Sequence, residues 1–101
     1  MLVEAEKCII ITERILVTRI IKYLETLGVS AYTIYHDVSG QGHRGLRSLS
    51  GGLSRFGENI RIEIIFEDEA KAHDVAHKIV DHYLSSKYAG IVYFEKVRIV
   101  K

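Results

Sequence analysis

Apolar positions recur with two different periods along this chain, and the changes of period predict its secondary structure. The segment Lys7–Thr12 is a short apolar run rich in β-branched residues, which is typical of a buried strand, and Met1–Glu6 is expected to be a short lead-in. From Glu13 to Leu27 the apolar residues recur at helical spacing, and Gly28 follows at the position of a helix-capping glycine. Ala31–Val38 is then predicted to form a second strand.

The second half of the chain repeats this order of elements. Ile60–Phe66 alternates between apolar and mostly polar positions, as a strand does when one face is buried. Asp68 is predicted to cap a second helix that ends near Leu84. A last strand follows from Gly90 to Phe94, with a continuation through Val97 to Val100 left open. The order βαββαβ predicts an α+β fold of the ferredoxin-like type, in which both helices cover one face of an antiparallel sheet.

The opposite face of this predicted sheet would be rather apolar. Ile9, Ile11, Ile65 and one side of the last strand are expected to lie on it. An open apolar face of this size usually marks an association surface, so we expect a homo-oligomer.

Length, charge and cysteine content narrow the class of protein. A chain of 101 residues is expected to form a single domain, residues 1–101, and its net charge of +1 does not indicate a nucleic-acid-binding protein. The single cysteine, Cys8, excludes an internal disulfide, and no apolar run approaches the length of about 20 residues that spans a bilayer. A cytoplasmic location is therefore expected.

The segment Ser39–Asn59, between the second and third predicted strands, is a long loop with two arginines among glycines. Long loops inside compact domains tend to be either functional or disordered. Gly40 and Gly42 let the backbone turn its N–H groups toward an anion, and Arg44 and Arg47 offer planar, charged groups for phosphate or carboxylate. The loop is predicted to bind a small phosphorylated ligand and to change shape on binding it.

The simpler interpretation of this loop is a solvated hairpin whose glycines and serines serve only flexibility. Arg44 and Arg47, however, follow a Gly-x-Gly turn at the mouth of a strand. Arg55 and Arg61 lie beyond them, with Glu58 as the only acidic residue between. This concentration of positive charge in an otherwise neutral protein favours anion binding.

Three side chains on the second predicted helix could form a metal-binding row. His73, His77 and Asp81 are spaced four residues apart and share one helix face. A solvated polar face explains the same spacing, and no fourth ligand is evident, so no metal site is expected.

Catalytic groups are not evident either. Cys8 lies within a predicted strand and is expected to be a packing residue. Glu13 and Glu63 have no evident carboxylate partner, so no general acid/base pair is visible and no enzyme activity is predicted.

A nucleic-acid-binding module is the alternative function, because the RNA-recognition motif has the same βαββαβ order. That module stacks bases on aromatic residues of its first and third strands. Neither Cys8–Thr12 nor Ile60–Ile65 contains an aromatic residue. This alternative is therefore disfavoured, and no nucleic-acid partner is expected.

Four segments of the chain resemble the PII-like signalling proteins, and in particular their SbtB type, which regulates bicarbonate transport. The segments are Ile11-Thr12-Glu13-Arg14-Ile15-Leu16, Ala31-Tyr32-Thr33, Gly40-x-Gly42-x-Arg44-x-x-Arg47-Ser48 and Tyr88-Ala89-Gly90-Ile91-Val92-Tyr93.

The resemblance implies a homotrimer of ferredoxin-like subunits with a nucleotide site in each cleft between neighbours. It implies adenine nucleotides (AMP, cyclic AMP, ADP or ATP) as regulatory ligands, with bicarbonate as a further ligand left open, and no cofactor. The long loop, called the T-loop in this family and placed at about residues 39–59, would dock on a membrane transporter or another target. By similarity, Gly40 and Gly42 form the loop base, Arg44 and Arg47 face the phosphate, and Thr33, Tyr88, Ala89 and Gly90 line the adenosine.

The chain departs from the classical nitrogen-signalling members of that family. Residues 39–58 contain no tyrosine that could be modified, and Ser85–Tyr88 is a poor match to their lysine-rich loop. Uridylylation and 2-oxoglutarate sensing are therefore not expected.

Overall fold

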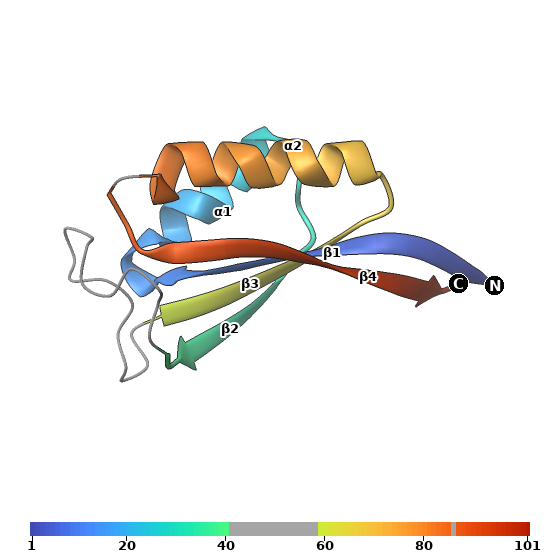
Figure 1. The fold of residues 1–101 in the computed structure, drawn as a ribbon, viewed down its shortest axis with the longest axis horizontal. Coiled ribbons are helices and arrows are strands. Elements are labelled where there is room, and N and C mark those ends of the chain that lie inside the picture. Colours follow the sequence, from blue (N-terminus) through green and yellow to red (C-terminus); the bar gives the residue numbers. More distant parts are fainter. Residues whose placement is uncertain (41–58, 86) are drawn as a thin grey trace.

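The computed structural model describes residues 1–40, 59–85 and 87–101. Four strands form one antiparallel sheet in the order β2-β3-β1-β4, and two helices cover one face of it (Figure 1). This arrangement confirms the predicted ferredoxin-like α+β fold. In chain order the elements are β1 (Leu2–Glu13), a 3-10 turn η1 (Arg14–Leu16), α1 (Val17–Thr26), β2 (Thr33–Val38), β3 (Asn59–Phe66), α2 (Glu69–Ile79), a π-helical turn η2 (Val80–Leu84) and β4 (Gly90–Val100).

The hydrophobic core lies between the helices and the two central strands. Alternate residues of β1 and β3 point toward the helices, because Cys8 lies opposite Ile64 and Ile10 opposite Ile62 in the ladder. The predicted apolar face of β3 is thus confirmed. Together with residues of both helices these side chains form one buried cluster: Cys8, Ile10, Leu16, Ile20, Leu24, Val29, Ile60, Ile62, Ile64, Phe66, Ala72, Val75, Ala76, Ile79 and Leu84.

The first strand is longer than the sequence predicted. It begins at Leu2, so the expected lead-in Met1–Glu6 was wrong, and β4 runs on to Val100. The two strands pair continuously from Leu2 opposite Val100 to Thr12 opposite Gly90, which gives the backbone of the first residues hydrogen-bonding partners. β1 and β4 extend together beyond the helices and carry both chain ends (Figure 1).

The first helix begins later than predicted. Glu13 still belongs to β1, where it lies opposite Asn59, so α1 starts at Val17 after η1 rather than at Glu13. The helix ends as predicted: Gly28 has φ +80°, and its N–H donates to the Glu25 carbonyl at 3.1 Å. The second strand begins at Thr33, two residues after the predicted start.

The predicted start and end of the second helical segment are confirmed. The Asp68 carboxylate accepts hydrogen bonds from the backbone N–H groups of Ala70 (3.0 Å) and Lys71 (3.2 Å), as an N-cap does. α2 ends at Ile79, and η2 continues the helical path to Leu84. No helix in the described ranges is long and apolar enough to cross a membrane.

The sheet face away from the helices is partly apolar, as predicted. Ile65 is 47% exposed there and Ile91 53%, whereas Ile9 is fully buried among its neighbours on the same face. Ion pairs interrupt this face, because the Lys7 ammonium lies 3.4 Å from Glu95. The face therefore combines apolar and charged positions.

Candidate functional site

The stems of the long loop and the turn before β4 lie at the same end of the sheet. In the ladder, Val38 at the end of β2 and Glu13 at the end of β1 both lie opposite Asn59, the first residue of β3. Thr12 lies opposite Gly90, where β4 begins. The stems of the long loop and the turn before β4, to which the sequence assigned all ligand contacts but that of Thr33, therefore meet the sheet at the same end (Figure 1).

The two stems of the loop are joined by a buried side chain. Asn59 is 1% exposed, and its Nδ2 donates to the Val38 carbonyl at 2.9 Å. β2 is irregular just before this point, with a register shift between Tyr35 and Val38 and a left-handed φ of 57° at Asp37. The bulge and this clamp set the direction in which the chain leaves the sheet.

Most of the predicted phosphate-binding residues lie outside the described residues. This applies to Gly42, Arg44 and Arg47. Gly40 is described, and a Cβ atom built there would meet no atom of the described residues within 4 Å, its chain neighbours aside. Gly40 does not have a positive φ either, so nothing in the described part of the chain requires glycine at this position.

The turn before β4 is held by the end of β1 through both backbone groups of Ala89. The Thr12 hydroxyl donates to the Ala89 carbonyl at 2.7 Å, and the Ala89 N–H donates to Glu13 Oε2 at 2.7 Å. Thr12 is fully buried and Glu13 is 4% exposed, so both bonds are shielded from water. A buried carboxylate that accepts a backbone N–H is a strong, directional restraint. Buried side chains of β1 therefore hold the turn in place against the sheet.

Glycine at position 90 is required by space. A Cβ atom at Gly90 would lie 2.7 Å from the Ile11 carbonyl oxygen and 3.0 Å from both Leu84 Cδ2 and Thr12 Cβ. The close approach of β4 to β1 explains this glycine without a ligand. Gly90 belongs to the segment Tyr88–Tyr93 that resembles the PII-like proteins, and packing within the chain is sufficient to explain why glycine stands there.

Tyr88 is oriented by an arginine of α1. The Arg19 guanidinium carbon lies 5.5 Å from the centroid of the Tyr88 ring, and Arg19 Nη1 donates to the Tyr88 hydroxyl at 3.3 Å. The Tyr83 hydroxyl donates to the Arg19 carbonyl at 3.3 Å, and the Tyr88 N–H donates to the Tyr83 carbonyl at 3.2 Å. These contacts bring an exposed cation to the turn.

Sequence reasoning missed Thr12, Glu13 and Arg19 as parts of this site. The signal that could have found two of them was the pair of polar residues, Thr12 and Glu13, directly after the apolar run Cys8–Ile11. Arg19 offered no signal, because its partner Tyr88 is 69 positions away in the chain.

Thr33 lies apart from the other predicted site residues. It is the first residue of β2 and lies opposite Glu63, four residues along β3 from Asn59. At the usual strand rise this separation is roughly 14 Å. One chain alone does not bring Thr33 to the Tyr88–Gly90 turn, so its part in a shared ligand site stays a prediction.

Arg61 does not add unpaired charge to the loop. Its Nε and Nη2 lie 2.7 Å and 2.6 Å from Glu63 Oε2, and its guanidinium stacks over Tyr35 at 5.6 Å. The hydrogen bond to Glu63 raises the pKa of Arg61 above its ordinary value. The positive charge proposed around the loop must therefore come from the arginines before β3.

Cys8 is a packing residue, as predicted. It is fully buried, and burial raises the pKa of its thiol to about 12. A thiol that stays protonated at neutral pH is a poor nucleophile.

Comparison with known proteins places this geometry in a family. The model of the family described as nitrogen regulatory protein P-II matches residues 5–101. A crystal structure described as that of a PII-like signalling protein from Thermus thermophilus is 33% identical, covers 98% of this chain and 92% of that chain, and has a TM-score of 0.74.

Two more distant structures share the fold. CPII, a nitrogen regulatory PII-like protein from Thiomonas intermedia K12 solved with ADP, AMP and bicarbonate, is 20% identical over 100% of this chain and 98% of that chain, with a TM-score of 0.78. The GlnK–ATP complex of B. subtilis is 19% identical over 91% of this chain and 82% of that chain, with a TM-score of 0.53. Because the family model spans nearly the whole sheet and both helices, the chain belongs to the nitrogen regulatory protein P-II family.

Proposed function

We propose that this chain is a PII-like regulator of the SbtB type that binds adenine nucleotides between the subunits of a homotrimer. AMP, cyclic AMP, ADP and ATP are the candidate ligands, with bicarbonate as a further one. The loop at about residues 39–59 controls a partner, and bicarbonate transport or another step of inorganic-carbon handling is the process. The protein acts by binding and not by catalysis.

The observation that carries this proposal is the fixed turn at Ala89, which lies beside the stems of the loop. Buried Thr12 and Glu13 hold both backbone groups of Ala89, so a ligand placed against the turn meets a surface that is already ordered. Preorganisation of this kind lowers the entropy lost on binding. The structure of CPII with ADP, AMP and bicarbonate supports the choice of ligand class.

Arg44 and Arg47 supply the contacts to the phosphate in this proposal. A charge-assisted hydrogen bond between a guanidinium and a phosphate contributes about 1.5–3 kcal/mol when it is partly shielded from water. Two such bonds are enough to order a loop, and a loop ordered in only one ligand state is a switch.

The trimer is supported by two features of the single chain. The sheet face away from the helices leaves Ile65, Ile91 and Tyr35 about half exposed. Thr33 also lies far along β2 from the Ala89 turn, so a site using both needs a second copy. A cleft between copies provides the enclosure that a small domain lacks.

The nucleic-acid-binding alternative finds little support on the sheet. The face of β1 and β3 away from the helices carries no aromatic residue, since Phe66 of β3 points into the core and is 6% exposed. The aromatic residues Tyr35 and Tyr93 come from the outer strands β2 and β4. Salt-sensitive RNA binding that AMP and ATP do not affect would favour this alternative.

Isothermal titration calorimetry of the full chain with AMP, cyclic AMP, ADP and ATP, with and without bicarbonate, tests the ligand. Replacement of both Arg44 and Arg47 by Ala is expected to weaken nucleotide binding at least tenfold, or roughly 1.4 kcal/mol. The matched control replaces Lys22 and Arg98 by Ala, because both are exposed and their loss changes the net charge equally. Absence of binding to all four nucleotides, or a monomer by light scattering, would contradict the proposal.

A further inference from the structure

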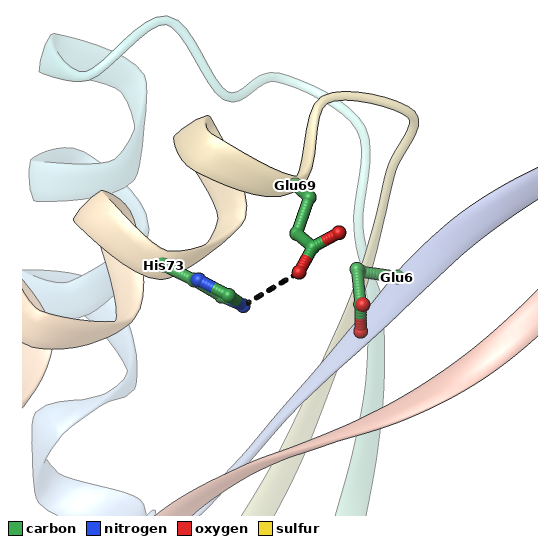
Figure 2. A group of neighbouring side chains, drawn as sticks. All are labelled: Glu6, Glu69 and His73. Atoms are coloured by element: carbon green, nitrogen blue, oxygen red, sulfur yellow. Dashed lines mark ion pairs between the residues drawn. The ribbon is translucent and has the colours of Figure 1, made fainter.

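Three side chains that can bind a metal meet where α2 begins beside β1. Figure 2 shows Glu6 of β1 with Glu69 and His73 of α2. One ligand atom from each lies within 4.8 Å of the other two. His73 Nε2 is 3.8 Å from Glu69 Oε1. This group differs from the row His73, His77 and Asp81, at which the sequence predicted no metal site, since only His73 is common to both.

Local structure fixes the position of each member. Glu69 and His73 are four residues apart on α2, so they share one helix face directly after the Asp68 cap. The His73 ring also packs on the Phe94 ring of β4, with centroids 5.0 Å apart. Glu6 lies opposite the core residue Phe66 in the ladder and therefore faces the helices. Two elements thus aim three ligand groups at one place.

The carboxylate of Glu6 is the unusual member of the group. Glu6 is only 6% exposed, and burial of a charged carboxylate costs free energy unless a cation accompanies it. The Lys96 ammonium provides one, 2.9 Å from Glu6 Oε1. The Lys96 side chain is itself 74% exposed, whereas that of Glu6 is 8% exposed, so Lys96 has far more room to move away.

We propose that Glu6, Glu69 and His73 bind one divalent transition-metal ion of the zinc type. An imidazole nitrogen with two carboxylates suits Zn²⁺, whereas Mg²⁺ and Ca²⁺ prefer oxygen ligands alone. Zinc bonds of about 2.0–2.2 Å require the ligand atoms to draw together, and the exposed ends of Glu69 and His73 can do this. Three protein ligands leave a fourth position for water.

The metal site is separate from the proposed nucleotide site. Glu6 lies six residues along β1 from Thr12, which is roughly 20 Å at the usual strand rise. Binding there ties the start of α2 to the β1–β4 ribbon, and an ion that binds only the folded chain stabilises it by mass action.

Calorimetric titration of the nucleotide-free full chain with Zn²⁺ alone tests this proposal. We expect the wild type to bind one Zn²⁺ ion per chain. The affinity of this site should fall at least tenfold in His73→Gln and in Glu69→Gln. His77→Gln is the matched control, because His77 lies one turn further along α2 and outside the group, and its zinc affinity is expected to equal that of the wild type. Circular dichroism verifies that each variant is folded. If His73→Gln does not fold, Glu69→Gln provides the test, because Glu69 is exposed.

Lys96→Gln adds a test in the opposite direction. Because the ammonium competes with the ion for Glu6, its removal is expected to strengthen zinc binding at least threefold. Wild-type affinity in His73→Gln and Glu69→Gln, an equal loss in His77→Gln, or no gain in Lys96→Gln would each overturn the site as described.

Discussion

The glycine that starts β4 gives a quantitative test of how tightly the turn is packed. In Gly90→Ala the new Cβ atom would lie 2.7 Å from the Ile11 carbonyl oxygen, a separation that real Cβ atoms essentially never show. Leu84 Cδ2, at 3.0 Å, is the end of a flexible side chain and can move. The carbonyl belongs to the backbone of β1 and moves only if the β1–β4 pairing shifts.

The expected loss of stability has two opposing parts. Overpacking of this kind typically costs about 1–3 kcal/mol. Replacement of glycine by alanine also restricts the unfolded chain, which stabilises the protein by about 0.4–1 kcal/mol. Gly40→Ala is the matched control, because a Cβ atom there meets no described residue within 4 Å beyond its chain neighbours. The difference between the two variants removes the unfolded-state part, so Gly90→Ala is expected to be less stable than Gly40→Ala by about 1–3 kcal/mol.

Urea denaturation followed by circular dichroism measures this difference. All three proteins are compared at one chain concentration, because association would make the apparent stability depend on it. Equal free energies of unfolding for Gly90→Ala and Gly40→Ala would refute the argument, since they would mean that β4 can retreat from the Ile11 carbonyl without cost.

Two other predictions concern buried groups of β1. Thr12→Val leaves the Ala89 carbonyl without its buried donor, so the free energy of unfolding measured by urea denaturation is expected to fall by about 1–3 kcal/mol. Adenine-nucleotide binding should weaken as well. A variant with wild-type stability and wild-type affinity would show that the turn does not need this bond. The pKa of Cys8 is raised from 9.0 to about 12, so the thiol ionises in the unfolded chain before it does in the folded one. The free energy of unfolding should therefore fall as pH rises from 9 toward 12, by at most about 1.4 kcal/mol per pH unit. Cys8→Ala should lack this part of the slope, and an unchanged slope would contradict it.

The parts of the fold that were predicted correctly depend on local pattern. The alternation of Ile60–Phe66, the cap at Asp68 and the left-handed Gly28 each follow from a few neighbouring residues. The first residues of β1 were not predicted as strand because polar residues interrupt the apolar pattern there. They pair with the last residues of β4, at the far end of the chain. Distant pairing of this kind decides a strand without leaving a local signal.

In the candidate site, too, local sequence identified a segment whose structure depends on distant residues. Tyr88–Gly90 was singled out by its resemblance to a family, but the reasons for its shape lie in β1. The Glu13 carboxylate holds a backbone N–H that is 76 positions away, and Gly90 is required by the carbonyl of Ile11. Neither contact can be read from spacing along the chain. A resemblance therefore located the turn, and only the fold explains it.

The end of β1 is the common support of the turn and the loop. Glu13 accepts the Ala89 N–H and also lies opposite Asn59, whose side chain holds the Val38 carbonyl. A displacement of the turn would thus reach both stems of the loop through the buried Ala89–Glu13 hydrogen bond, the pairing of Glu13 with Asn59 and the Asn59–Val38 hydrogen bond. Energetic coupling requires such a contiguous set of packed and bonded groups, or an element with two states that both sites bias. If a nucleotide binds against the turn, Glu13→Gln should therefore reduce the effect of the nucleotide on partner affinity. The affinity for the nucleotide itself should fall by a smaller factor. Equal losses in both would assign Glu13 to the support of the turn alone.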